Sequence, residues 1–307
     1  MVRIVSLLPS ATEIVCSLGL ANDLVGVTHE CDYPPEVRTK AALTRSRLPD
    51  DARTPADVDR FVSASVDGGE LIYELDVDQI RALDPDLILS QDLCRVCAVP
   101  SGHVTDALAV LGCSAAVLSL DAHTLDGVIE TIVHVGEATG ARATAIRMVT
   151  TLRARVDAVR RAAESLPRPR TLALEWSDPP FSGGHWVPEM IGIAGGSPLL
   201  SEQGTPSRRL SWEEIGAARP ELVVFMPCGY ALDRAADEGR AVIARPELRA
   251  ARVVAVDANA VFSRPGPRLV DGLEALAWIQ HPDRFAPPPP GTVIELRTRA
   301  GQGTTGG

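Results

Sequence analysis

Two cysteines, Cys94 and Cys97, are separated by two residues and follow shortly after the apolar run DLIL at residues 86–89. Thiolates are soft metal ligands, and a close pair of thiols can also act as a redox couple. A single CxxC without a second pair or a suitably spaced pair of histidines is an incomplete structural zinc site. Three interpretations therefore stay open: buried structural thiols, part of a zinc site, or functional thiols at a ligand, with Cys31 and Cys228 as possible further members.

Other polar and aromatic side chains gather in loops that follow predicted strands. With the thiol pair, the candidate ligand-binding residues are His29, Glu30, Cys31, Tyr33, Cys94, Cys97, Trp176, Asp178, Phe181, His185, Trp186, Tyr230 and Arg264. Open parallel sheets bind ligands at the carboxyl ends of their strands, and flat aromatic walls with a few polar groups suit a large macrocycle. Each aromatic residue could equally belong to a core.

Two of these candidates have a more specific chemistry. His29 could ligate cobalt or iron through a neutral imidazole, with His185 as its rival, so His29, Cys94 and Cys97 are the candidate metal ligands. Arg264 stands between Ser263 and Pro265, where a stiff turn would hold it. It either pairs with the ligand or forms a salt bridge that closes the C-terminal lobe.

Composition excludes several classes of protein. The 307 residues carry a formal net charge of -10, whereas a nucleic-acid surface is basic. No GxGxxG follows the first predicted strand, and the chain has no GxxxxGK(S/T) loop and no GxSxG elbow. We therefore expect neither nucleic-acid binding nor one of these enzyme types.

The N-terminal segment predicts where the protein resides. Its apolar run is interrupted by Pro9, Thr12 and Glu13, whereas a signal peptide needs an unbroken apolar region of about 7–15 residues. No window approaches the roughly 18 apolar residues of a membrane span, and six scattered cysteines are too few for a disulfide scaffold. We expect a cytoplasmic protein, or a periplasmic or cell-surface one if the true start lies further upstream.

An internal repeat predicts the architecture. The segment LDVDQIRALDPDLIL from Leu75 aligns without a gap on LSWEEIGAARPELVV from Leu210. Each copy predicts a short amphipathic helix, a proline that ends it, and a strand buried on both faces. The fold class is therefore α/β, with two lobes that each contain a mostly parallel sheet flanked by helices, at residues 1–122 and 170–285.

The two lobes are expected to be joined by one long helix. Apolar residues from Ala145 to Leu166 recur at alternating spacings of four and three, which puts them on one helical stripe. Within the connection 123–169 this predicts a helix over 141–166, about 39 Å long, that ends before Pro167. Residues 286–307 have no strong periodicity and predict a flexible tail.

Several motifs together resemble one known family. They are IVSLLPSATEIVCSLG, VGVTHECDYP, IRALDPDLIL, MIGIAGG and, most specifically, SRPGPRLVDGLEALA at residues 263–277. From Val2 to Phe285 the chain resembles the substrate-binding proteins of vitamin B12 and iron-complex ABC importers, the BtuF-like class with two lobes and a helical spine. The thiol pair and the unexported start depart from that pattern.

The resemblance implies a non-catalytic protein that binds a corrinoid or iron chelate between its lobes. It also implies docking of one acidic residue per lobe, Asp78 and Glu213, on a permease, although carboxylates in the first turn of a helix are favoured without any partner. We therefore expect a monomeric binder of cobalamin or a related corrinoid. Two alternatives stay open: an iron-chelate, haem or metal-ion binder that uses the Cys/His residues, and a thiol-dependent corrinoid-processing enzyme.

Overall fold

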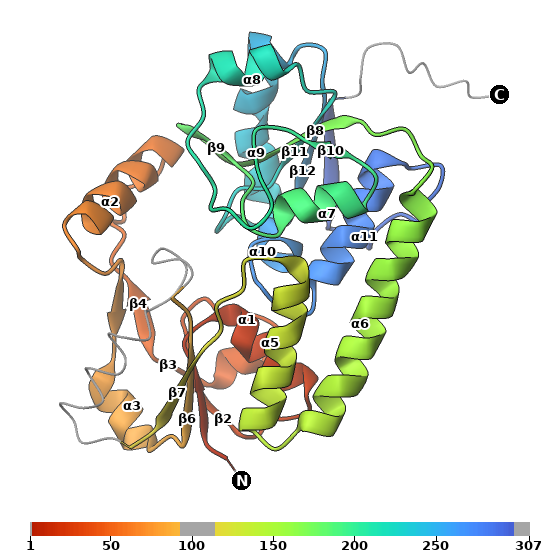
Figure 1. The fold of residues 1–307 in the computed structure, drawn as a ribbon. Coiled ribbons are helices and arrows are strands. Elements are labelled where there is room, and N and C mark those ends of the chain that lie inside the picture. The colour runs from red at the N-terminus through yellow and green to blue at the C-terminus, as the bar shows by residue number, and fades with distance from the viewer. Residues whose placement is uncertain (1, 93–113, 298–307) are drawn as a thin grey trace. The chain divides into compact units, whose positions relative to one another are not determined.

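The computed structural model describes residues 2–92 and 114–297 (Figure 1). The chain divides into two compact units, of residues 1–122 with 126–151 and of residues 123–125 with 152–307. The first part of the chain forms these elements: β1 Ile4–Ser6, α1 Pro9–Ser17, β2 Leu24–Val27, the 3-10 helix η1 Pro35–Thr39, β3 Ala41–Ala42, β4 Thr44–Ser46, α2 Pro55–Asp67, β5 Tyr73–Leu75, α3 Val77–Leu83, β6 Leu87–Ser90, β7 Ala116–Ser119, α5 Leu125–Ala138 and α6 Arg142–Ala163. The second part forms these: β8 Arg170–Ser177, β9 Pro180–Ser182, α7 Val187–Ile193, β10 Ser197–Pro198, α8 Trp212–Ala218, β11 Leu222–Phe225, α9 Leu232–Ile243, the 3-10 helix η2 Pro246–Leu248, β12 Arg252–Val256, α10 Ala258–Val261, α11 Leu269–Gln280 and β13 Val293–Arg297.

Each unit is built on one mostly parallel sheet, which confirms the predicted fold class. In the first unit the strand order is β3-β2-β1-β6-β7 with parallel pairing throughout. In the second the order is β10-β8-β11-β12-β13, where β13 and the short β9 pair antiparallel to their neighbours. The central strands β1, β6, β8 and β11 carry apolar residues that are almost wholly buried, as expected for strands covered on both faces.

The two copies of the internal repeat have the same local structure. Asp76 caps α3 by accepting a hydrogen bond from the Gln79 N–H, and Ser211 caps α8 in a capping box with Glu214. Both helices end at residues with left-handed backbone, Asp84 at φ 42° and Arg219 at φ 45°. A strand then begins at the same position of each copy, β6 in the first and β11 in the second.

An arginine at the beginning of the opening strand of each unit, just before β1 or as the first residue of β8, completes this correspondence. The Arg3 guanidinium donates to the carbonyls of Leu83 and Asp84, and the Arg170 guanidinium donates to the carbonyls of Ala218 and Arg219. The Arg3 N–H donates to Asp86 at 2.8 Å, and the Arg170 N–H to Glu221 at 3.0 Å. Both arginines therefore satisfy the last carbonyls of a short helix and tie it to the sheet.

Helix α6 contains the apolar stripe that the sequence predicts. Ala145, Val149, Leu152, Val156, Val159 and Ala163 are all buried, with at most 6% of each residue exposed. The helix ends at Ala163 rather than at residue 166, because Leu166 closes a turn on the Ala163 carbonyl and the residue before Pro167 is disfavoured in the helical region.

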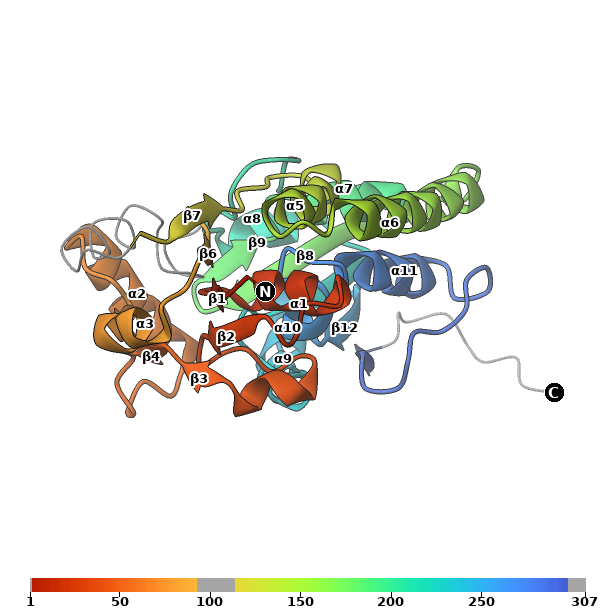
Figure 2. The ribbon, with the colours of Figure 1, turned by 90° about the horizontal axis from the view of Figure 1, so that it is seen from below.

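Each end of α6 packs on a second helix of its own unit (Figures 1 and 2). In the first unit a Cβ on Gly136 of α5 would lie 2.5 Å from the Ala145 Cβ, so the close approach of α5 to α6 requires glycine. In the second unit Arg155 of α6 donates to Asp271 at 2.6 Å and to Glu274 at 2.7 Å on α11.

The segment expected to be a flexible tail contains a strand. Val293–Arg297 forms β13, which pairs antiparallel with β12, and Leu296 packs against the core of the second unit. The structure differs here from the expectation because pairing with a preformed sheet edge stabilises a five-residue strand that is too short to show periodicity by itself.

Candidate functional site

The strand order of each sheet defines where a ligand site is expected. In the first sheet β1 lies between β2 and β6, so the chain continues from β1 to one side and later returns to the other side. In the second sheet β8 lies in the same way between β10 and β11. The carboxyl ends of β1 and β6, and of β8 and β11, are therefore the switch points at which open α/β sheets bind ligands.

Near these strand ends in the first unit, the loop after β2 groups His29 with Tyr73. Their ring centroids are 5.5 Å apart, and the Tyr73 hydroxyl donates to Glu30 at 3.3 Å. The His29 Nδ1 lies 2.7 Å from the Thr44 hydroxyl oxygen. A hydrogen bond at Nδ1 fixes the ring and makes Nε2 the nitrogen that can ligate a metal.

Cys31 and Tyr33 follow in the same loop but differ in exposure. The Cys31 sulfur is buried, 3.1 Å from the Thr12 hydroxyl oxygen and 3.3 Å from that of Thr28. Tyr33 is 45% exposed. Cys94 and Cys97 lie outside the described residues, so the structure gives no position for the CxxC pair.

In the second unit three aromatic rings follow one another at the switch point. Trp176 of β8 pairs across strands with Phe181 of β9, and side chains opposite each other on paired strands share one face. The Trp176 ring also lies 5.2 Å from the ring of Tyr230, which follows β11. We call Phe181, Trp176 and Tyr230 the aromatic strip.

Two predicted residues close to β8 are tied into the fold. Trp186 is 5% exposed, and its indole Nε1 donates to the Phe262 carbonyl at 2.9 Å. His185 has a left-handed backbone at φ 53°, and its ring lies 5.8 Å from that of His123. Burial and the neighbouring His123 lower the pKa of His185, so its imidazole is neutral at pH 7.

The His185 Nε2 atom is buried and has no hydrogen-bond partner in residues 2–92 and 114–297. The remaining predicted residues of this unit lie nearer the surface. Asp178 and Cys228 are exposed, and Arg264 is half-buried in the loop after α10.

Sequence reasoning missed Glu175, which neighbours Trp176. One of its carboxylate oxygens accepts the Gly184 N–H at 3.1 Å, and the other accepts the Ser207 hydroxyl. Burial raises the pKa of the Glu175 carboxyl, against the lowering effect of these two donors. The only signal in the sequence was an acid inside the apolar strand TLALEWS.

The two acids expected at a docking surface occupy equivalent places. Asp78 and Glu213 are both exposed in the first turns of α3 and α8. The caps of these helices are formed by Asp76 and by Ser211 with Glu214, so neither Asp78 nor Glu213 is needed to start its helix.

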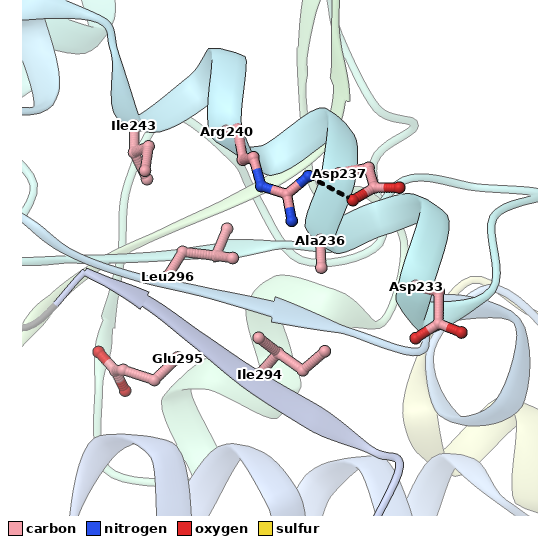
Figure 3. Close-up of a pocket in the computed structure, with 8 residues that line it drawn as sticks. All are labelled: Asp233, Ala236, Asp237, Arg240, Ile243, Ile294, Glu295 and Leu296. Carbon is pink, nitrogen blue, oxygen red and sulfur yellow. Dashed lines mark hydrogen bonds and ion pairs between the residues drawn. The ribbon is translucent and has the colours of Figure 1, made fainter.

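A pocket of about 670 Å³ lies elsewhere on the second unit. Figure 3 shows the residues that line it. Its walls are α9 and β13, through Asp233, Ala236, Asp237, Arg240, Ile243, Ile294, Glu295 and Leu296. The Arg240 guanidinium is held by Asp237 at 2.6 Å within it. None of the predicted ligand-binding residues lines this pocket.

Two further observations limit what the site can be. Across the described ranges, no group of three or more His, Cys, Asp or Glu side chains is arranged to hold a metal ion. The expected Cys/His metal site is therefore not supported by that part of the chain. No helix there has the length and apolar character needed to cross a membrane.

Two α/β units with switch-point strands and one long helix match the architecture that the motifs predict for a substrate-binding protein of the type found with ABC transporters. The family described as periplasmic binding protein matches residues 4–266, and this chain belongs to that family. The predicted resemblance is confirmed, and with it the expectation that the protein is not an enzyme.

Individual relatives extend over most of the chain. It is 26% identical over 289 residues to the uncharacterized ABC transporter substrate-binding lipoprotein YvrC of Bacillus subtilis, covering 92% of this chain and 81% of the relative. It is 25% identical over 280 residues to a vitamin B12-binding protein of Vibrio cholerae, covering 89% and 86%.

Solved structures share the fold. The periplasmic vitamin B12 binding protein BtuF of Vibrio cholerae superposes with a TM-score of 0.63 at 22% identity, covering 90% of this chain and 94% of that one. A periplasmic heme binding protein from Pseudomonas aeruginosa superposes with a TM-score of 0.70 at 21% identity, covering 97% and 99%.

These comparisons overturn the expectation of a cytoplasmic protein. The family is one of periplasmic binding proteins, and YvrC is a lipoprotein. The apolar N-terminal run forms β1 and the start of α1, so its interruption at Pro9 marks the strand-to-helix turn of the fold. It carries no information about export.

Proposed function

We propose that this protein binds cobalamin or a related corrinoid and delivers it, chemically unchanged, to an ABC permease. The aromatic strip at the switch point of the second unit is the observation that carries the proposal. Trp176 and Phe181 are both half-buried, so each retains ring surface for a flat apolar ligand. The vitamin B12-binding relatives, which align over most of this chain, support the same ligand class.

The first unit holds predicted ligand-binding residues of its own, among them a candidate metal ligand. The exposed Tyr33 ring would contact the macrocycle, while His29 would present Nε2 to the metal. Cobalt is a suitable metal for a neutral imidazole. Two further predictions belong to this proposal. Cys94 and Cys97 contact the ligand, and Asp178 and Arg264 pair with its amides or phosphate.

A haem or another iron chelate is the second candidate. The Thr44 contact at 2.7 Å orients His29 in the way that metal-ligating histidines are usually held by a second group. Iron, like cobalt, accepts imidazole nitrogen. The heme binding protein of Pseudomonas aeruginosa shares the fold over nearly the whole chain.

The test is a visible absorption titration of the purified, reduced protein with aquocobalamin and, separately, with hemin. We expect saturable binding of aquocobalamin that Trp176→Ala weakens about tenfold or more, because stacking on one aromatic ring contributes on the order of 1–2 kcal/mol. Trp212→Ala is the matched control, since Trp212 lies in the same unit but stacks under Arg245 instead.

Ligation is tested separately in the same titration. If His29 binds the metal, His29→Ala abolishes the shift of the corrin bands, and a Cys94→Ser, Cys97→Ser double variant tests the thiols in the same way. Saturable binding of hemin but not of aquocobalamin would replace the corrinoid by haem. Binding of neither would contradict the proposal.

A further inference from the structure

Arg234 extends the aromatic strip with a positive charge. Its guanidinium carbon lies 3.8 Å from the centre of the Tyr230 ring, and one guanidinium N–H donates to the Tyr230 hydroxyl at 3.1 Å. Tyr230 is only 4% exposed and packs with Ala235 and Ala255, whereas Arg234 is exposed. A rigid, buried ring therefore holds a solvent-facing guanidinium in one orientation.

This cation stands next to the ligand site proposed above. Tyr230 contacts Trp176, so the Arg234 guanidinium is one ring away from the indole that would carry the macrocycle. Of the five N–H donors of arginine, the hydrogen bonds of the described residues use one, to Tyr230. The others can form a bidentate pair with a carboxylate or phosphate.

The carboxylates near Arg234 in the described part of the chain do not form an ion pair with its guanidinium. No ion pair joins Arg234 to a carboxylate within residues 2–92 and 114–297, although Asp233 precedes it and Glu238 acts electrostatically on Tyr230. A cation in the first turn of α9 is also unfavourable toward the helix dipole. Local rules of this kind are most often broken at functional sites.

A second cation lies at the other end of the strip. The guanidinium carbon of Arg209 is 5.6 Å from the centre of the Phe181 ring, and the two residues form an isolated β-bridge. The strip is therefore flanked by positive charge at both ends, on a chain whose net charge is -10. Guanidinium groups beside an aromatic surface favour an anionic group on the ligand.

We infer that the ligand bears a carboxylate or phosphate that Arg234 receives while the metal macrocycle lies on Trp176. This rests on the proposed function and narrows it to metal complexes that carry an acidic group. Arg234 would thereby determine specificity, because a complex without that group leaves the guanidinium without its anion.

The test uses two pairs of probes that differ in the acidic group. Aquocobalamin carries a phosphodiester that diaquocobinamide lacks, and hemin carries two carboxylates that hemin dimethyl ester lacks. Dissociation constants are measured by absorption titration for the native protein, Arg234→Gln and Arg234→Lys. Arg240→Gln is the control, because Arg240 lies on the same helix and is held by Asp237.

For whichever pair the native protein binds, we expect tighter binding of the acidic member. Arg234→Gln should raise the dissociation constant of that member about tenfold or more, and change that of the other member by less than about twofold. Arg234→Lys should give an intermediate loss, since lysine keeps the charge without the bidentate geometry. Arg240→Gln should change neither.

Two results would overturn this inference but would leave the proposed function unaffected. One is equal affinity of the native protein for both members of a pair. The other is an equal loss for both members in Arg234→Gln, which would make Arg234 a support for Tyr230 only. Failure of the native protein to bind any of the four probes would instead overturn the proposed function, and this inference with it.

Discussion

Replacing Trp186 by phenylalanine separates a structural role from a ligand-binding one. The indole is 5% exposed and its N–H donates to the Phe262 carbonyl at 2.9 Å. Loss of the donor costs about 1–3 kcal/mol, because the buried carbonyl is left without it. A residual void on the order of 40 Å³ adds about 1 kcal/mol. We expect Trp186→Phe to lower the free energy of unfolding by about 2–4 kcal/mol.

The assay is urea unfolding followed by far-UV circular dichroism, together with the aquocobalamin titration. Trp212→Phe is the matched control, because Trp212 is half-buried and its ring stacks under Arg245 at 4.2 Å. That variant should lose less than about 1 kcal/mol. The reasoning would be refuted if the free energy of unfolding of Trp186→Phe lay within about 0.5 kcal/mol of the native value while its corrinoid affinity fell tenfold.

Two further predictions concern Glu175 and the docking acids. Because burial raises the pKa of Glu175 above its ordinary 4.5, the native state favours the protonated form, and that contribution is complete below pH 4.5 and lost as the pH rises through the native pKa. Between these pKa values the free energy of unfolding should fall with a slope approaching about 1.4 kcal/mol per pH unit, and Glu175→Gln should lack this slope in urea unfolding from pH 4.5 to 8; parallel profiles would contradict it. Asp78→Lys and Glu213→Lys should each weaken pull-down by vesicles containing the permease more than about tenfold, since each reverses an exposed charge, with ligand affinity unchanged; undiminished capture would exclude docking through these acids.

The parts of the fold that could be predicted are those in which local pattern and tertiary contacts agree. The stripe from Ala145 to Ala163 recurs at helical spacing and is buried at each position. The repeat is detectable because both copies need the same cap, the same left-handed end and the same buried strand. By contrast, β13 depends on an edge provided by β12, which no local pattern reveals.

The sequence places the candidate site in a set of loops but does not give the contacts within them. Residues at strand ends, such as Trp176 and Tyr230, follow from the rule that parallel sheets bind ligands at carboxyl ends. Trp186 lies in the same loop region, yet its indole faces the core, because side-chain direction depends on the turn before α7. Arg234 gave no signal, since an arginine near a helix start resembles any surface residue until its ring partner is known.

The duplicated framework explains how the two units can carry different chemistry. Arg3 and Arg170 anchor equivalent helices to equivalent strands, so the switch point is formed in the same way in each unit. The residues in the loops that follow the strands do not anchor these helices. In the first unit these loops carry His29, which Thr44 orients. In the second unit the corresponding strand ends and loops carry the aromatic strip, which ends at the Arg234 guanidinium. A shared framework can carry different functions through its loop residues, so the two sets of loops can differ in chemistry while the framework stays the same.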